Sequence, residues 1–132
     1  MHAHFTGLQQ TMKVETILIK PNSPFANAIA EWTAQRQFQS AVFNRNDEPD
    51  EGIDGLVIFS ENQELDKESE EIRASFDRKQ KPVHKIDING TLMVAISNLD
   101  LWFERNGCKR VLMIGSDSLV KNPNLERVLN SL

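Results

Sequence analysis

The loop Gly115-Ser116-Asp117-Ser118 follows a short apolar run and precedes a helix start at Asn122-Pro123. Serine hydroxyls and free backbone N–H groups can donate hydrogen bonds to a ligand, and a glycine lets the backbone approach a ligand closely. In open α/β sheets, ligands bind beyond the carboxyl ends of parallel strands, where such a loop would lie. We therefore expect Gly115, Ser116 and Ser118 to line a concave ligand site.

Other loops and helix starts would share this edge of the sheet. The polar side chains on them that we predict to bind a ligand are Asn22, Ser23, Ser60, Ser69, Asn89 and Thr91. Three carboxylates are candidates for acid–base chemistry, namely Glu70 and Glu71 after Ser69, and Asp87 at a strand end. No catalytic pairing stands out around them, so the catalytic residues stay undetermined.

The same edge lacks the glycine patterns that hold phosphates. The first loop, Lys20–Phe25 (KPNSPF), contains no glycine, and neither G-x-G-x-x-G nor a P-loop occurs in the chain. Acidic residues crowd the segment 61–71, and Asp117 lies in the last loop. Each full negative charge outweighs the partial positive charge of a helix N-terminus at a similar distance. We expect a neutral or cationic small molecule to fit better than a nucleotide, and the sequence identifies no cofactor.

The remaining reactive side chains are predicted to have structural roles. Cys108 follows a helix C-terminus, where the helix dipole raises the pKa of a thiol, so we expect a small buried hydrophobe. His84 shares a strand face with Ile86 and is expected to be a core histidine. His2 and His4 lack the further ligands that a stable metal site needs, so we predict no metal.

The hydrophobic pattern predicts the elements that position these loops. Short apolar or β-branched runs predict strands at 14–19, 40–43, 55–59, 82–88 and 110–114. Apolar residues recur at helical spacing within 23–38, 60–80, 92–106 and 123–132. Strands that alternate with helices cross over right-handedly, which places helices on both faces of a parallel sheet. The prediction is a three-layer α/β fold of about five parallel strands, with the strand order left open.

Length and pattern favour one domain. Residues 1–12 have neither strand nor helix periodicity and are predicted to be a flexible arm, while 13–132 would form a single domain. Met12 is an alternative start to Met1. The one cysteine excludes an internal disulfide and suits a reducing cytoplasm.

Charge and hydropathy limit the partners. Nineteen acidic against 15 basic residues give a net charge of −4, which disfavours a nucleic-acid binder. No apolar run approaches the ~18 residues of a membrane helix, and the first residues lack the apolar centre of a secretory signal. We expect a cytoplasmic protein with a small-molecule ligand and without nucleic-acid or membrane partners. Self-association stays open.

The second part of the chain carries a family pattern. It consists of an Asp-Gly strand, a Lys-Pro strand that ends in Asp, a tryptophan on the next helix and a closing Lys-x-Pro. The residues that carry it are Asp54-Gly55, Lys81-Pro82, Asp87, Trp102, Lys121 and Pro123. With these features, residues 54–132 resemble the molybdenum-carrier branch of the SLOG superfamily of Rossmann-like nucleotide-binding domains. The resemblance implies a Rossmann-like fold and a small-molecule or nucleotide site.

The departures from the family fall on its functional parts. Where the family has a glycine-rich first loop, a Gly-Gly-Thr helix start and an arginine in the last loop, this chain has KPNSPF, Lys67-Glu68-Ser69 and Ser116–Val120. We therefore predict a Rossmann-like small-molecule or nucleotide-binding domain of SLOG or molybdenum-carrier type with a degenerate phosphate site.

Two alternative functions stay open. One is an enzyme that cleaves N-glycosidic bonds, like nucleoside deoxyribosyltransferases and phosphoribohydrolases, with Glu70 or Glu71 assisted by Asp87. The other is a non-catalytic interaction module that keeps the fold without using the site. On these features, we favour a protein that is not an enzyme.

Overall fold

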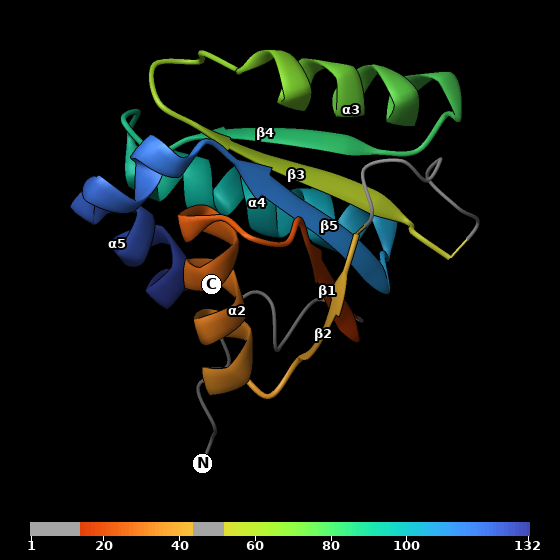
Figure 1. Ribbon diagram of the computed structural model, residues 1–132, viewed down its shortest axis with the longest axis horizontal. Helices are drawn as coiled ribbons and strands as arrows, with labels where there is room; N and C mark the ends of the chain where they lie inside the picture. Colours follow the sequence, from red (N-terminus) through yellow and green to blue (C-terminus); the bar gives the residue numbers. More distant parts are fainter. Residues whose placement is uncertain (1–13, 44–51) are drawn as a thin grey trace.

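The computed structural model describes residues 14–43 and 52–132, so the predicted arm with His2 and His4 lies outside the described ranges. The described chain builds one sheet with helices on both faces (Figure 1). In chain order its elements are β1 (Thr16–Ile19), α2 (Pro24–Gln35), β2 (Gln39–Val42), β3 (Gly55–Ser60), α3 (Lys67–Arg78), β4 (Val83–Asp87), α4 (Leu92–Asn106), β5 (Arg110–Gly115), the 3-10 helix η1 (Asp117–Lys121) and α5 (Pro123–Ser131). The predicted three-layer fold is confirmed.

All five strands of this sheet are parallel, in the order β2-β1-β5-β3-β4. Every residue of β3 is buried, as is every residue of β5 after Arg110. Strands covered on both faces need such continuous apolar runs. The last strand, β5, lies between β1 and β3, so the chain reverses its direction of travel across the sheet at this place. That reversal creates the position where ligands bind in open α/β sheets.

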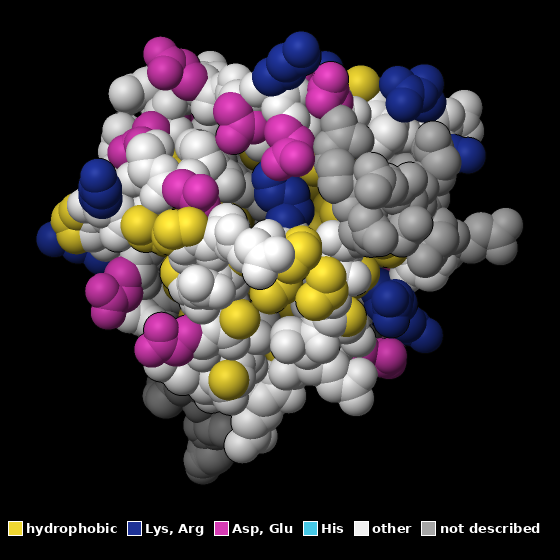
Figure 2. All heavy atoms as spheres, in the orientation of Figure 1, with side chains coloured by type: hydrophobic (Ala, Val, Ile, Leu, Met, Phe, Trp, Pro, Cys, Tyr) yellow, Lys and Arg dark blue, Asp and Glu magenta, His cyan; other side chains and the backbone are white. Residues whose placement is uncertain are grey.

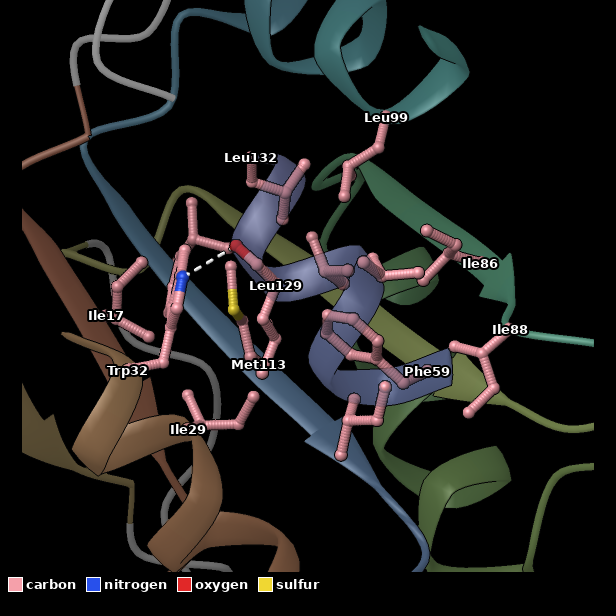
Figure 3. Packing of buried hydrophobic residues seen from close by; sticks show 14 of the residues in the cluster. Ile17, Ile29, Trp32, Phe59, Ile86, Ile88, Leu99, Met113, Leu129 and Leu132 are labelled. Carbon is pink, nitrogen blue, oxygen red and sulfur yellow. Dashed lines mark hydrogen bonds between the residues drawn. The ribbon is translucent and has the colours of Figure 1, made fainter. Parts of the chain in front are cut away.

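The two faces of the sheet bury separate hydrophobic clusters. Helices α2, α4 and α5 cover one face, to which β1 contributes Ile17. Helix α3 covers the other face, to which β1 contributes Leu18, because successive side chains of a strand point in opposite directions. The first cluster includes Trp32, whose Nε1–H donates to the backbone oxygen of Leu129, 2.8 Å away (Figure 3). This bond joins α2 to α5. None of the helices in the described ranges is long and apolar enough to cross a membrane.

Capping residues fix where the helices begin and end. Ser23 accepts a hydrogen bond from the Ala26 N–H at 3.0 Å, and Pro24 follows at the first helical position. An N-cap hydroxyl and a proline at this place stabilise a helix start. Helix α4 ends at Gly107, whose φ of +58° lies in the left-handed region that favours glycine.

Three residues of the family pattern, Asp54, Gly55 and Trp102, stabilise the amino-terminal edge of the sheet. The Asp54 carboxylate accepts hydrogen bonds from the backbone N–H groups of Lys109 and Arg110, at 2.8 and 3.0 Å. A Cβ at Gly55 would lie 2.9 Å from the Trp102 ring and 2.8 Å from the Cys108 sulfur, so glycine makes room for both. These residues therefore hold the fold at the end opposite to the expected ligand edge.

Trp102 lies on α4 over the edge strand β4 and is not fully buried. Its indole packs beside Phe103 and over His84 of β4, with ring centroids 5.2 and 5.7 Å apart. Because β4 is an edge strand, one side of the indole stays accessible and the residue is half-buried. His84 is half-buried for the same reason, and burial lowers the pKa of its imidazole. Cys108 is buried as predicted, and burial raises the pKa of its thiol from 9.0 to about 11.

Candidate functional site

A hollow of about 570 Å³ lies at the carboxyl ends of β1 and β5, where the chain reverses direction across the sheet. Its size falls within the range of small-molecule sites. We call it the β1–β5 crevice. Its lining residues are Lys20, Pro21, Asn22, Ser23, Val42, Phe43, Asp66, Glu68, Gly115, Ser116 and Asp117.

The start of helix α2 faces this crevice but holds a carboxylate of the protein itself. The Phe25 N–H donates to Oδ1 of Asp117 at 3.2 Å. Pro24 has no N–H to offer, and the Ala26 N–H is bonded to Ser23. A helix start attracts anions through its free N–H groups and its partial positive charge. At α2, Asp117 takes the place that a phosphate oxygen would need.

The start of helix α3 is capped in the same way. Asp66 accepts a hydrogen bond from the Ser69 N–H at 2.7 Å. In the first turn of this helix, Glu68 forms an ion pair with Lys20, which lies just after β1. The Lys20 side chain is only 17% exposed, that of Glu68 is 44% exposed, and both residues line the crevice. Among the described residues that line the crevice, the one lysine or arginine therefore already pairs with an acid.

Gly115 has a packing role in this structure. A Cβ there would lie 2.7 Å from Cδ1 of Leu119 and 2.8 Å from Cε1 of Phe25. The space above the glycine is filled by these two side chains. Its backbone still lines the crevice beside Ser116.

Beyond the crevice, a network of side-chain hydrogen bonds occupies the carboxyl ends of β3 and β4. Glu61 accepts from the Ser118 hydroxyl at 3.4 Å and from the Asn122 amide at 3.0 Å. The Asn122 amide also donates to Asn89 Oδ1 at 2.7 Å. Oδ1 of Asp87 accepts from the backbone N–H groups of Asn62 and Asn89. These groups bond one another across three loops.

The predicted ligand residues therefore separate into groups. Asn22, Ser23, Gly115 and Ser116 line the crevice, whereas Ser118 and Asn89 belong to the network around Glu61. Thr91 lines a second hollow of about 360 Å³ between β4 and α4.

Two predicted serines have structural roles. Ser60 is buried and its hydroxyl donates to the Ile86 backbone oxygen at 3.4 Å. Ser69 is buried inside the first turn of α3, where its N–H is capped by Asp66.

The candidate catalytic carboxylates lie outside the crevice lining. Glu70 is exposed and pairs with Arg73 on the next turn of α3, at 3.2 Å. Glu71 is exposed as well, and the carboxylate of Asp87 accepts hydrogen bonds from two backbone N–H groups of the network. The acids that line the crevice are Asp66, Glu68 and Asp117.

The sequence reasoning did not select these three acids as site residues. For Asp66 a local signal existed, because an aspartate three residues before Ser69 at a helix start is a typical N-cap pattern. Glu68 and Asp117 have no local signal, because their partners are distant in sequence. Val42 and Phe43, at the end of an edge strand, were also not selected.

The fold and the crevice together define a Rossmann-like α/β domain with a concave site at the carboxyl edge of its parallel sheet. No protein-family model and no curated protein matches the chain. Among solved structures, it is similar to the crystal structure of "Putative molybdenum carrier protein" from Syntrophus aciditrophicus SB. The TM-score is 0.68 at 13% sequence identity, over 92% of this chain and 94% of that chain. The similarity confirms the distant resemblance and the fold.

Proposed function

We propose that this domain binds a small organic molecule without a phosphate group in the β1–β5 crevice. It would then be a Rossmann-like binding domain of SLOG or molybdenum-carrier type whose phosphate site is degenerate. The observation that carries the proposal is the pair of carboxylates at the two helix starts. Asp117 binds the Phe25 N–H and Asp66 binds the Ser69 N–H, which are donors that an anionic ligand would otherwise use.

The similar structure is named "Putative molybdenum carrier protein", which raises the question of a molybdenum compound. Molybdate is an oxyanion and needs N–H donors or cations around it. In this chain, Lys20 is paired with Glu68, and both helix starts at the crevice are capped by carboxylates. The described residues also contain no group of three His, Cys, Asp or Glu side chains that could hold a metal ion. The donor set does not fit molybdate, so we propose a neutral or cationic ligand instead.

Calorimetric titration tests the exclusion of anions directly. The full-length protein is titrated at low salt with ATP, AMP, NAD and molybdate, and we expect no micromolar binding of any of them. Thermal-shift screening of neutral and cationic compounds forms the positive arm, because a ligand at 100 times its Kd stabilises a protein by about 2.7 kcal/mol. Micromolar binding of a nucleotide that Ser116→Trp abolishes would overturn the proposal and restore a phosphate site.

A second candidate function, the interaction module, is favoured by one observation on α4. Met93, Val94 and Leu101 are 81, 56 and 41% exposed on this helix. Exposed apolar groups that share a helix face are typical of protein–protein contacts. We propose self-association through this face as the alternative. Light scattering on the wild type and on Val94→Lys/Leu101→Lys would show a loss of dimer in the variant, and a monomeric wild type would contradict it.

A further inference from the structure

Helix α4 leaves a row of apolar side chains uncovered on the side away from the sheet. Of the five large hydrophobic residues that are exposed in the described ranges, Met93, Val94 and Leu101 lie on this helix. Met93 and Leu101 are eight residues apart with the exposed Ser97 midway between them. Side chains four residues apart share one face of a helix. We call this row, Met93, Ser97 and Leu101 with Val94 beside it, the α4 stripe.

The α4 stripe is separate from the β1–β5 crevice. Helix α4 lies behind the sheet in the orientation of Figure 1. Figure 2 shows the near side of the molecule, where acidic and basic side chains lie around a hydrophobic patch. Among the described residues, none from α4 lines the crevice. Binding of a small molecule and contact through α4 can therefore be measured independently.

Resting on the second candidate function, we infer that the α4 stripe binds the α4 stripe of a second copy of this chain. The two helices are antiparallel, and a two-fold axis passes beside Ser97. This axis places Met93 against Leu101 of the partner subunit, and the same contact is repeated on the other side of the axis. Because Ser97 is small, the two helices can approach closely where they cross. The stripe is therefore complementary to itself.

Charges at the two ends of α4 favour the antiparallel arrangement. The exposed Glu104 lies in the last turn, seven residues after Ser97 and so on the side of the stripe. The first turn of α4 contains no acidic residue, and among the described residues Thr91 makes no capping hydrogen bond through its side chain. Gly90, just before this turn, lies seven residues before Ser97. The axis therefore brings each Glu104 to the start of the other α4, where free N–H groups and a partial positive charge favour a carboxylate.

The orientation and the size of the contact determine what kind of dimer is expected. An antiparallel pair keeps the two Glu104 residues about 20 Å apart, since each lies seven residues from the axis. A parallel pair would bring the two carboxylates together. The stripe is small beside the roughly 20–30 residues that each partner contributes to a stable interface. We therefore expect a reversible dimer with a Kd in the micromolar range.

Formation of an intermolecular disulfide tests this geometry. Ser97→Cys places two thiols across the axis, where closely packed helices bring Cα atoms within reach of a disulfide. Asn98→Cys is the matched control, because Asn98 is also exposed on α4 but is turned by about 100° from Ser97. Both full-length variants and the wild type, whose Cys108 is buried, are oxidised and compared by non-reducing electrophoresis. We expect Ser97→Cys to form covalent dimer about ten times faster than Asn98→Cys, because its thiols meet at a high effective concentration.

Sedimentation equilibrium tests the role of charge. Glu104→Gln should raise the Kd of the dimer about three- to thirtyfold, because two symmetry-related carboxylates each lose a favourable contact with a helix start. Glu70→Gln is the matched control, since it removes the same charge from α3 on the other face of the sheet. It should leave the Kd unchanged. All four substituted residues are exposed, and an unchanged melting temperature establishes that each variant is folded.

The outcomes separate this geometry from self-association itself. If the wild type stays monomeric at millimolar concentration, both the inference and the second candidate function fail. If it forms a dimer while Ser97→Cys and Asn98→Cys react at equal rates, self-association stands and the geometry is overturned. Equal Kd values of Glu104→Gln and Glu70→Gln would overturn the antiparallel arrangement. Binding in the β1–β5 crevice is independent of all these outcomes.

Discussion

The carboxylate of Asp117 accepts a hydrogen bond from the backbone N–H of Phe25 at 3.2 Å and so caps a helix 92 residues away in sequence. This contact joins the loop after β5 to the start of α2. It places a negative charge of the protein where Rossmann-like domains commonly hold the phosphate of a ligand.

Removal of this carboxylate should have two effects. Asp117→Ala leaves the Phe25 N–H without its partner and should lower the free energy of unfolding by about 0.5–2 kcal/mol, the usual loss at a helix start. It should also make inorganic phosphate stabilise the protein, because a donor and a partial positive charge become accessible. Urea denaturation with and without phosphate measures both. A variant that gains no response to phosphate would contradict the proposed reason for the degenerate site.

Gly115→Ala should destabilise the protein in the absence of any ligand. The added Cβ would meet Leu119 and Phe25 at 2.7 and 2.8 Å. Such overpacking costs about 1–3 kcal/mol. Gly90→Ala is the matched control, because the nearest atom to its Cβ is the Asp87 oxygen at an ordinary 3.5 Å. Chemical denaturation of both variants compares the losses, and equal losses would show that packing above Gly115 is not the cause.

Trp102 and Gly55 should be energetically coupled. Trp102→Ala is expected to cost about 3 kcal/mol, the lower end for large aromatic truncations, because the indole is half-buried. In the wild type, Gly55→Ala is expected to cost about 1–3 kcal/mol, since its Cβ would lie 2.9 Å from the indole. In the Trp102→Ala background the cost of Gly55→Ala should fall. A double-mutant cycle by urea denaturation measures the difference, and additive losses would contradict the contact.

Asp100 should make stability depend on pH. Its Oδ1 is buried without a hydrogen-bond partner among the described residues, and burial raises the pKa of the carboxyl above its ordinary value of 3.8. The carboxyl of Asp100 ionises at lower pH in the unfolded chain than in the folded protein. Its contribution to the free energy of unfolding is therefore fully present below pH 3.8. It is lost as the pH rises through the folded pKa.

Asp100→Asn removes this ionisation and should stabilise the protein at neutral pH but not in acid. Denaturation with urea across a pH series measures the difference between the variant and the wild type. A destabilised variant at neutral pH would show that the carboxylate has a favourable partner when the protein is folded.

The elements of this fold follow from local patterns in the sequence. Strand β3 coincides with the apolar run that begins at Gly55, and α2 begins where Ser23 and Pro24 predict a helix start. These elements can be predicted from the sequence because strand and helix periodicity, capping and turn residues act over a few positions of the chain. The structural residues of the family pattern, including Asp54 and Trp102, can be recognised in the sequence for the same reason.

The order of the strands and the character of the crevice were decided only by the tertiary structure. The insertion of β5 between β1 and β3 depends on which buried faces pack best, and no local pattern encodes that choice. The sequence predicted that Asp117 and the acids of 61–71 lie at this edge of the sheet, but it did not indicate which acids of 61–71 line the crevice. Asp117 reaches Phe25, and Glu68 reaches Lys20 from 48 residues away, because the sheet brings their loops together. Glu70, two residues after Glu68, pairs instead with Arg73, since side chains two positions apart on a helix do not share a face.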